Sequence, residues 1–278
     1  MEHLIRPAGV AGETIAVTPQ TAGWQYLSFR VVALAAGEQY TVHSGGEEVA
    51  LVPLQGAGRL TVDRGEYTLS RSSVFTGPPS LLYAPPRQTI QVTAERAFEF
   101  AIGGAPATGK YGVRLIRPDE IKCEIRGGGA AQRQVNHILA PPLPAERLIL
   151  FEVYVPGGAW SGWPPHCHDG ADGSPYLEET YYYRIDPVDG FAIHRNYRLD
   201  GTFDELLLVR NGDLVLVTQG YHPVAAAPGS NVYFLNYLAG ELLDEERARP
   251  PLDDFHYAWM KKDWEGNRLV LPLPGTRP

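Results

Sequence analysis

The sequence has little cysteine, and this shortage bears on where the protein works. Two cysteines, Cys123 and Cys167, stand among 278 residues, too few for a small secreted scaffold held together by disulfides. The N-terminus carries an acidic side chain at position 2 and lacks the apolar core of a secretory signal peptide. We therefore expect a cytoplasmic protein in a reducing compartment.

Long apolar stretches and excess positive charge are also missing. No segment approaches the roughly 18 to 20 apolar residues of a membrane-spanning helix, because glycine, proline or a charged residue interrupts each apolar run. The formal net charge is −8, and lysine and arginine are scattered rather than clustered. We therefore expect neither a membrane nor a nucleic-acid partner.

Glycine and proline are abundant, and they favour short strands over long helices. The 30 glycines and 24 prolines leave few uninterrupted windows for a helix, while runs rich in β-branched, aromatic and leucine residues recur between turn residues. Such runs lie at 26–34, 48–54, 89–95, 147–155, 180–186, 205–217 and 231–239. The pattern predicts an all-β sandwich or barrel, with two short helices at 240–250 and 253–264.

The chain is long enough for two domains, and its composition suggests where they meet. Glycine and proline cluster over 126–148, where the apolar periodicity lapses, so we expect domains at 1–125 and 126–278. The segment from Glu47 resembles the segment from Glu178, which indicates a duplicated fold. No His-x-His precedes Glu48. If the halves are duplicates, the N-terminal one is expected to lack a metal site.

Two histidines one residue apart, in PPHCHDG at 164–170, are the first candidate metal ligands. On an extended strand the side chains of His166 and His168 point to the same face, while Cys167 points away. Neutral imidazole is a common ligand of divalent transition metals. A lone His-x-His also fits an ordinary surface loop, so further ligands are needed.

Two further candidate ligands follow downstream. Glu179 opens the aromatic strand ETYYYR, and His222 follows Gly220 after a short apolar strand. Each candidate stands at the start or end of a predicted strand, so three histidines and one carboxylate could converge inside a small barrel. Together they predict a centre for one divalent metal ion.

The same residues resemble the metal motifs of the cupin superfamily. The order is His-x-His, glutamate, Gly-Asp with a short strand, then glycine and histidine, although Thr218 replaces the usual proline. The segments 126–139, 146–169, 178–191, 212–229 and 233–240 further resemble the 5-deoxy-glucuronate isomerase family of inositol catabolism. That family is itself similar to the 4-deoxy-threo-hexosulose-uronate ketol-isomerases.

This resemblance implies a bicupin, in which two antiparallel β-barrels of the jelly-roll type are joined and the second binds a divalent metal. The implied ligands are His166, His168, Glu179 and His222. The implied reaction interconverts 5-deoxy-D-glucuronate and 2-deoxy-5-keto-D-gluconate, an aldose–ketose change on a small sugar acid. Zinc, manganese, iron and nickel all suit such ligands. Cys167 and His194 depart from the family pattern, which has lysine and glutamine there.

Isomerisation of an aldose to a ketose requires that the charge developing on two oxygens be stabilised. It also requires an acid or base near the two adjacent carbons between which the hydrogen moves. The candidates for the acid or base are Glu178, Tyr181, Tyr183 and His194. If Glu179 points into the barrel, strand alternation places both tyrosines on the same face and Glu178 on the other. We expect the tyrosines near the substrate, and Glu178 as a solvated charge or a support for the ligands.

A uronate also carries a carboxylate, which arginine recognises through paired hydrogen bonds. The candidates are Arg133, Arg184 and Arg195, with Asn236 as a further polar contact. Arg184 faces outward by strand alternation unless a bulge intervenes. A surface salt bridge is the alternative role of each arginine.

Other functions fit the same ligands. A metal-dependent cupin dioxygenase would use them with iron and oxygen, a related uronate ketol-isomerase would act on another sugar acid, and a sugar-binding cupin would not turn over. An intact ligand set in one half favours a working enzyme over the last of these. Pairing through edge strands into a homo-oligomer would protect those edges, but the sequence leaves the oligomeric state open.

Overall fold

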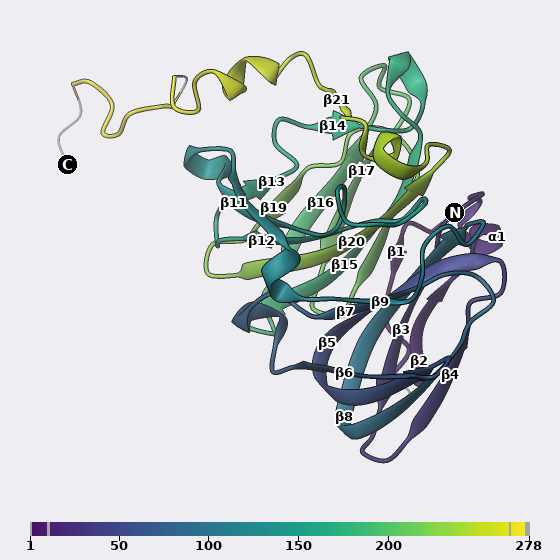
Figure 1. Ribbon diagram of the computed structural model, residues 1–278. Helices are drawn as coiled ribbons and strands as arrows, with labels where there is room; N and C mark the ends of the chain where they lie inside the picture. Colours follow the sequence, from purple (N-terminus) through teal and green to yellow (C-terminus); the bar gives the residue numbers. More distant parts are fainter. Residues whose placement is uncertain (1, 10–11, 267, 276–278) are drawn as a thin grey trace.

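The chain folds almost entirely into antiparallel strands (Figure 1). The computed structural model describes residues 2–9, 12–266 and 268–275. Within these residues the only α-helix is α1, Pro19–Ala22. Short 3-10 helices lie at Val74–Thr76 (η1), Pro118–Glu120 (η2), Gly129–Ala131 (η3), Ala171–Gly173 (η4), Asp244–Ala248 (η5) and Ala258–Lys261 (η6). The all-β prediction is confirmed. None of these helices has the length and apolar character that crossing a membrane requires.

The first half of the chain forms one curled eight-stranded sheet. Its strands are β2 (Gly12–Val17), β3 (Ser28–Leu34), β4 (Gln39–His43), β5 (Glu47–Val62), β6 (Gly65–Arg71), β7 (Leu81–Ala84), β8 (Thr89–Pro106) and β9 (Arg114–Ile116). They run in the order β2-β3-β8-β5-β7-β9, with β4 beside β8 and β6 beside β5. Alternate side chains of the long strands β5 and β8 fill the interior with aliphatic and aromatic groups.

The second half contains two larger sheets and one small one. The seven-stranded sheet runs β1-β18-β15-β20-β12-β11-β10, the four-stranded sheet runs β13-β19-β16-β17, and β14 pairs with β21. The bounds are β1 Leu4–Ile5, β10 Lys122–Arg126, β11 Arg133–Leu139, β12 Ile149–Val155, β13 Trp160–Ser161, β14 His166–Cys167, β15 Leu177–Asp186, β16 Ala192–Tyr197, β17 Asp204–Val209, β18 Leu214–Val217, β19 Val224–Ala226, β20 Asn231–Gly240 and β21 Leu252–Asp253.

Strand β15 separates two cores by simple alternation. Tyr181 and Tyr183 pack in the core of the second barrel, whereas Tyr182 belongs to the core that both halves of the chain share. The next outward residue, Arg184, forms an ion pair with Glu99 of the first half. The face assignment made from the sequence therefore holds along this strand.

Two buried carboxylates join the halves in a reciprocal way. Glu48 on β5 accepts hydrogen bonds from the backbone N–H groups of residues 146–148 in the second half. Glu178 on β15 accepts them from residues 25–27 in the first half. Glu178 is only 1% exposed, so the expectation of a solvated charge was wrong. It caps a loop of the other half, because the three unpaired N–H groups of that loop need an acceptor.

The strand registers show how the two halves correspond. Glu48 lies opposite Ala105, and Glu178 lies opposite Ala239, so these two glutamates are equivalent. The following residue is Val49 in the first half and Glu179 in the second. The alignment made from the sequence paired Glu47 with Glu178 and was one residue out of register. At the equivalent position, the first half therefore carries valine in place of the candidate carboxylate ligand.

The two helices expected near the C-terminus were wrong. The segment 240–250 contains only the 3-10 helix η5, because Asp244 has a φ of 53° and so interrupts helical geometry. Arg247 is 1% exposed and donates to the carbonyls of Leu143 and Leu148, which fixes the segment against an earlier loop. The segment 253–264 holds the end of β21 and the 3-10 helix η6.

The division at residue 125 stays a prediction. Strand β10 spans Lys122–Arg126, so the expected boundary falls inside a strand that pairs with β11. Near the N-terminus, β1 also crosses over and pairs with β18. Both termini of the first half thus contribute strands to the sheet of the second half.

Candidate metal centre and active site

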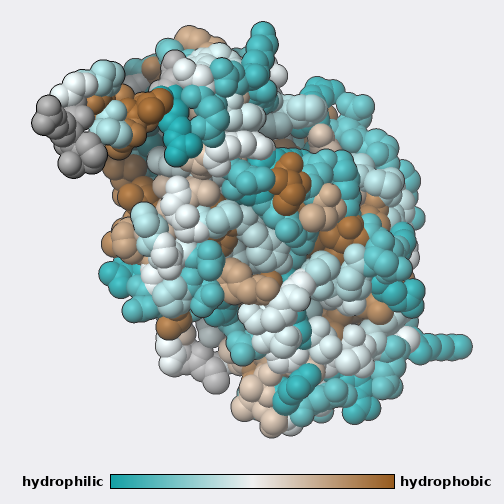
Figure 2. Space-filling model, turned by 90° about the vertical axis from the view of Figure 1, so that its left-hand side faces the viewer, coloured by the Kyte–Doolittle hydropathy of each residue, from teal (hydrophilic) through white to brown (hydrophobic). Residues whose placement is uncertain are grey.

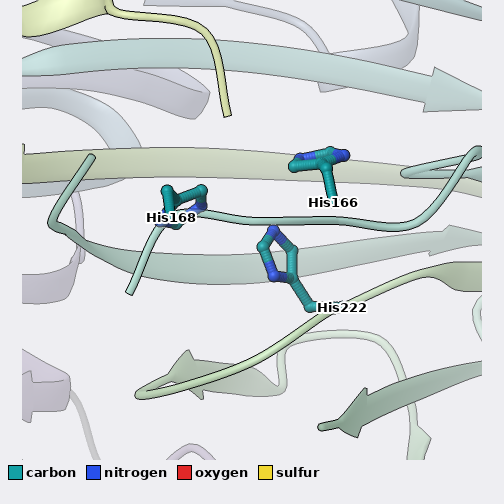
Figure 3. Close-up of side chains that lie close together, drawn as sticks. All are labelled: His166, His168 and His222. Carbon is teal, nitrogen blue, oxygen red and sulfur yellow. The ribbon is translucent and has the colours of Figure 1, made fainter. Parts of the chain in front are cut away.

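Three imidazoles gather at one end of the second barrel (Figure 3). His166 lies on β14, His168 follows that strand, and His222 lies just before β19. One ring nitrogen from each lies within 4.8 Å of the others. Figure 3 shows the His222 ring rising from its own segment toward the segment that carries the other two. The three predicted histidines therefore meet in space.

Glu179 completes the cluster from the start of β15. Its Oε2 lies 3.0 Å from Nε2 of His168 and 3.3 Å from Nε2 of His222. Glu179 is 4% exposed, so water does not share this carboxylate freely. All four candidate ligands are thus close together, although 56 positions separate His166 from His222 in the sequence.

The hydrogen bonds around the cluster turn two ring nitrogens toward Glu179. Nδ1 of His168 lies 2.9 Å from the carbonyl of Leu177, and Nδ1 of His222 lies 3.1 Å from that of Gly220. A carbonyl can only accept, so Nδ1 of each ring carries a proton and Nε2 of each ring faces the Glu179 carboxylate. Among the described residues, the buried Nε2 of His222 has no hydrogen-bond partner. Such a set needs a cation among the donors, and a divalent metal ion fits it.

The pKa shifts of Glu179 and His166 favour the forms that bind metal. Burial raises the pKa of Glu179, but the hydrogen bond from His168 and the nearby imidazole of His222 outweigh it and bring the pKa to about 2. Burial, then the neighbouring imidazoles, holds the pKa of His166 well below its ordinary value. Burial lowers the pKa of His168, yet the Glu179 carboxylate raises it overall. A proton at His168 therefore takes the place that a metal ion would fill.

A cavity of about 710 Å³ opens beside the cluster. Three of the candidate ligands, His166, His168 and Glu179, line it. Much of the remaining wall is apolar, with Phe151 and Phe234 among the lining residues. The cavity is large enough for a sugar acid and dry enough on these sides to strengthen electrostatic interactions.

Arg133 differs from the other cations of this cavity. Its Nη1 donates to the carbonyls of Ala131 and Trp163 at 3.1 and 3.0 Å, and its Nε is buried without a partner. Within the described residues it forms no ion pair, whereas the other lining cations are each paired with a carboxylate. Those cations are Lys122, Arg126, Arg249 and Lys261. Burial, then the charge of Arg126, lowers the pKa of Arg133 to about 10, so it stays cationic at neutral pH.

The candidate catalytic residues form two layers. Tyr181 and Asn236 line the cavity. Behind them the Tyr183 hydroxyl lies 2.7 Å from Nδ1 of His194, whose Nε2 lies 3.0 Å from Oδ1 of Asn196. The amide oxygen can only accept, so His194 donates through Nε2 and accepts from Tyr183 through Nδ1.

Burial sets the protonation of both layers. Burial, then the nearby His222, lowers the pKa of His194 to about 3, which keeps this ring neutral. Burial, then the charge of Glu179, raises the pKa of Tyr181 well above its ordinary value. Tyr181 therefore remains a hydrogen-bond donor at neutral pH, and its ring contacts His194 edge-on at 4.8 Å.

Two predicted substrate arginines lie elsewhere. Arg184 pairs with Glu99 and covers the Tyr182 ring, on the face turned to the first half. Arg195 forms two hydrogen bonds with Asp204, at 2.8 and 2.7 Å, on the exposed side of the four-stranded sheet. Neither is among the described residues that line the cavity. Each has the salt-bridge role that the sequence left as the alternative.

The C-terminal segment supplies wall residues that the sequence did not indicate. Asp253, Lys261 and Trp264 line the same cavity. They lie within 253–264, a stretch rich in aromatic and charged residues, which is the only sequence signal that marks them. Their distance from the histidines along the chain hides this role.

Comparisons with known proteins agree with this architecture. The model of the KduI/IolB family matches residues 3–260. A 5-deoxy-glucuronate isomerase from Geobacillus kaustophilus is 42% identical over 249 residues, which cover 86% of this chain and 90% of that protein. One from Bacillus subtilis is 35% identical over 233 residues, which cover 81% of this chain and 85% of that protein.

Solved structures show the same fold. An IolB-like protein from Salmonella typhimurium is 38% identical, with a TM-score of 0.89 over 94% of this chain and 100% of that chain. Oxalate decarboxylase from Lactobacillus farciminis, 11% identical, matches with a TM-score of 0.61 over 87% of each chain; this second likeness concerns the fold alone. The predicted bicupin fold is confirmed, and the chain belongs to the KduI/IolB family.

Proposed function

We propose that this protein is a metal-dependent 5-deoxy-glucuronate isomerase, which converts 5-deoxy-D-glucuronate to 2-deoxy-5-keto-D-gluconate in myo-inositol catabolism. Relatives with that name align with most of the chain. One observation carries the proposal further: a single cavity joins the histidine–carboxylate cluster to the half-buried guanidinium of Arg133, which has no ion-pair partner among the described residues. A sugar acid can offer hydroxyl and carbonyl oxygens to the metal cluster and its carboxylate to Arg133.

His166, His168, Glu179 and His222 would hold the ion, which is zinc, manganese, iron or nickel. When bound, a divalent ion polarises a sugar carbonyl and stabilises negative charge on neighbouring oxygens. The donor set fits this group, because the lone pair of His222 Nε2 has no other partner among the described residues.

Arg133 orients the substrate in this proposal. Its guanidinium is held by the carbonyls of Ala131 and Trp163, and this leaves N–H groups free for the carboxylate of the sugar acid. The apolar wall around Phe151 and Phe234 excludes water from the far side and strengthens this ion pair. Fixing the carboxylate determines which carbons of the sugar reach the cluster.

Tyr181 acts as a hydrogen-bond donor at the cavity wall. Its phenol stays protonated, so it can hydrogen-bond an oxygen that gains charge during the reaction. Tyr183 and His194 position it from behind, since the hydrogen-bond chain from Tyr183 through His194 to Asn196 fixes the ring against which Tyr181 packs. Asn236, whose Nδ2 donates to the carbonyl of Thr180, borders the same wall.

An oxygen-free assay tests the proposed reaction. Metal-loaded protein is incubated with 5-deoxy-D-glucuronate in deuterated water, and the product is followed by NMR. We expect the ketose to form without oxygen, and deuterium in the product would indicate an enediol route. Absence of the ketose would overturn the isomerase proposal, and turnover only with oxygen would favour a dioxygenase.

A further inference from the structure

The strand that carries His166 depends on the C-terminal segment. In the two-stranded sheet His166 lies opposite Asp253, and Cys167 lies opposite Leu252. Within the described residues β14 has no other strand partner. The backbone that presents the first candidate ligand is therefore held by a distant segment, since Asp253 lies 87 positions after His166 in the chain.

His166 needs this support more than the other two histidines. His168 and His222 each have Nδ1 against a backbone carbonyl, at 2.9 and 3.1 Å, so a hydrogen bond fixes each ring. Among the described residues His166 has no such bond; its ring packs against His222 with the centroids 4.8 Å apart. Its place in the cluster is therefore set by its backbone.

Asp254 anchors the segment beside β14. It is 1% exposed, and its Oδ2 accepts a hydrogen bond of 2.6 Å from the Tyr197 hydroxyl. Its Oδ1 accepts from the backbone N–H of His256 at 2.9 Å. Its own N–H donates to the carbonyl of Pro165 at 2.7 Å, one residue before His166. Asp254 thus ties the four-stranded sheet and the C-terminal turn together through its buried carboxylate, and it holds the residue before the ligand strand through its backbone N–H.

A second contact holds the same segment at the cavity wall. Nε1 of Trp163 lies 2.9 Å from Sδ of Met260, and the rings of Trp163 and Tyr257 lie 4.8 Å apart. Trp163 lines the cavity, as does Lys261, which pairs with Asp253. The contacts on both sides of β14 therefore fix how the C-terminal segment meets the cluster.

We propose that residues 252–264 complete the metal centre, with Asp254 as the positioning residue that holds β14 and so places His166. This inference rests on the proposed metal site but not on the identity of the substrate. Loss of a group that orients a ligand typically weakens metal binding by about 10- to 100-fold. The consequence concerns metal affinity first, and catalysis only through it.

The test measures affinity for zinc and manganese by competition with a chelator. In the full chain we expect Asp254→Ala to weaken binding about tenfold or more, Tyr197→Phe to weaken it less, and Asp254→Asn to restore part of the loss. Asp200→Ala is the matched control, because Asp200 bonds only nearby groups on an exposed turn and should change nothing. Melting temperatures with and without metal separate positioning from unfolding: the metal-induced rise should shrink in Asp254→Ala.

Two truncations provide a second, independent comparison. A chain that ends at residue 251 should lose high-affinity binding. A chain that ends at Gly266 should keep it, because the residues it lacks include the exposed Leu269, Val270 and Leu271, which do not line the cavity. Figure 2 views the side from which the C-terminal end projects in Figure 1 and shows brown, apolar residues there.

The outcomes separate this inference from the proposed reaction. Unchanged metal affinity in Asp254→Ala and in the chain ending at 251 would overturn the positioning role while the isomerase stands. If metal affinity depends on Asp254 but the wild-type protein makes no ketose, the positioning role would be supported and the isomerase proposal would be overturned. A wild-type chain that binds neither ion would overturn both.

Discussion

The two barrels share a scaffold, but only one of them carries a polar centre among the residues described. In the first, Val49 and its neighbours Val32, Leu51 and Ile102 belong to one apolar core. In the second, Glu179 occupies the position of Val49 and contacts two of the three clustered imidazoles, those of His168 and His222. The same strand pairing thus supports either a filled core or an ion site, and the side chain at one register position separates them.

The structural roles of the two halves are nevertheless alike. Glu48 and Glu178 each cap a loop of the other half through three backbone N–H groups. Both lie on the outward face, whereas the metal position lies one residue later on the inward face. The duplicated fold therefore keeps the contacts between its halves on one face of the strand, while the side chains on the other face, inside the barrel, can differ.

The largest expected effect comes from making the second barrel resemble the first. Glu179→Val should abolish tight metal binding and lower kcat/KM by about a thousandfold. The metal-free fold should survive, because valine removes a buried charge and already occupies the equivalent position, Val49, in the first barrel. Elemental analysis and isomerase kinetics measure this, with the exposed Glu241→Val as control. Normal metal content in Glu179→Val would contradict the ligand assignment.

The reverse change should not create a second site. Val49→Glu buries a carboxylate in an apolar core without a partner and should lower the free energy of unfolding by about 3 kcal/mol. Urea unfolding and metal stoichiometry would show this, with Val49→Leu as the size control. Binding of a second equivalent of metal would mean that the first barrel retains ligands that its apolar core does not reveal.

Arg133 should affect substrate binding more than metal binding. Arg133→Ala should raise KM by about thirtyfold, corresponding to about 2 kcal/mol for a lost charged hydrogen-bond pair, while metal affinity stays within twofold of wild type, as measured in the chelator assay. Arg195→Ala is the matched control, since Arg195 pairs with Asp204 at the surface. Equal KM values for the two variants would remove the carboxylate role of Arg133.

The smallest effect concerns the joint between the halves. Burial raises the pKa of Glu146, but the Thr108 hydroxyl and the N–H groups of residues 108–110 outweigh it, so the pKa is lowered from 4.5. Glu146 therefore stabilises the fold above pH 4.5, and this contribution is lost as the pH falls through the lower folded value. Glu146→Gln should lower the free energy of unfolding by about 1 kcal/mol at pH 7. It should also weaken the dependence of this free energy on pH in the acid range, as measured by urea unfolding. An unchanged acid slope would contradict this linkage.

The sequence was most informative where one strand carries the signal. The i, i+2 spacing of His166 and His168 and the alternation along β15 predicted which side chains share a face. The sequence could not predict the capping role of Glu178, because the three N–H groups that Glu178 binds lie about 150 positions earlier. The prediction of C-terminal helices was wrong for the same reason, because distant carbonyls hold Arg247 and local propensity does not decide the conformation of this segment.

The substrate arginines show the same limit. From residue types alone, Arg133, Arg184 and Arg195 were equivalent candidates. Only the fold shows that Glu99 and Asp204 pair with two of them, and that the cavity contains the third. The support of β14 by Asp254 was likewise invisible, since a two-residue strand has no periodicity to detect.

The most direct test of the central claim is the metal content of the purified, metal-loaded chain and of His222→Ala. If His166, His168, Glu179 and His222 hold one ion in the second barrel, elemental analysis should find one divalent ion per wild-type chain and a large loss in the variant. An equal ion content in the two proteins, with both folded, would contradict the account.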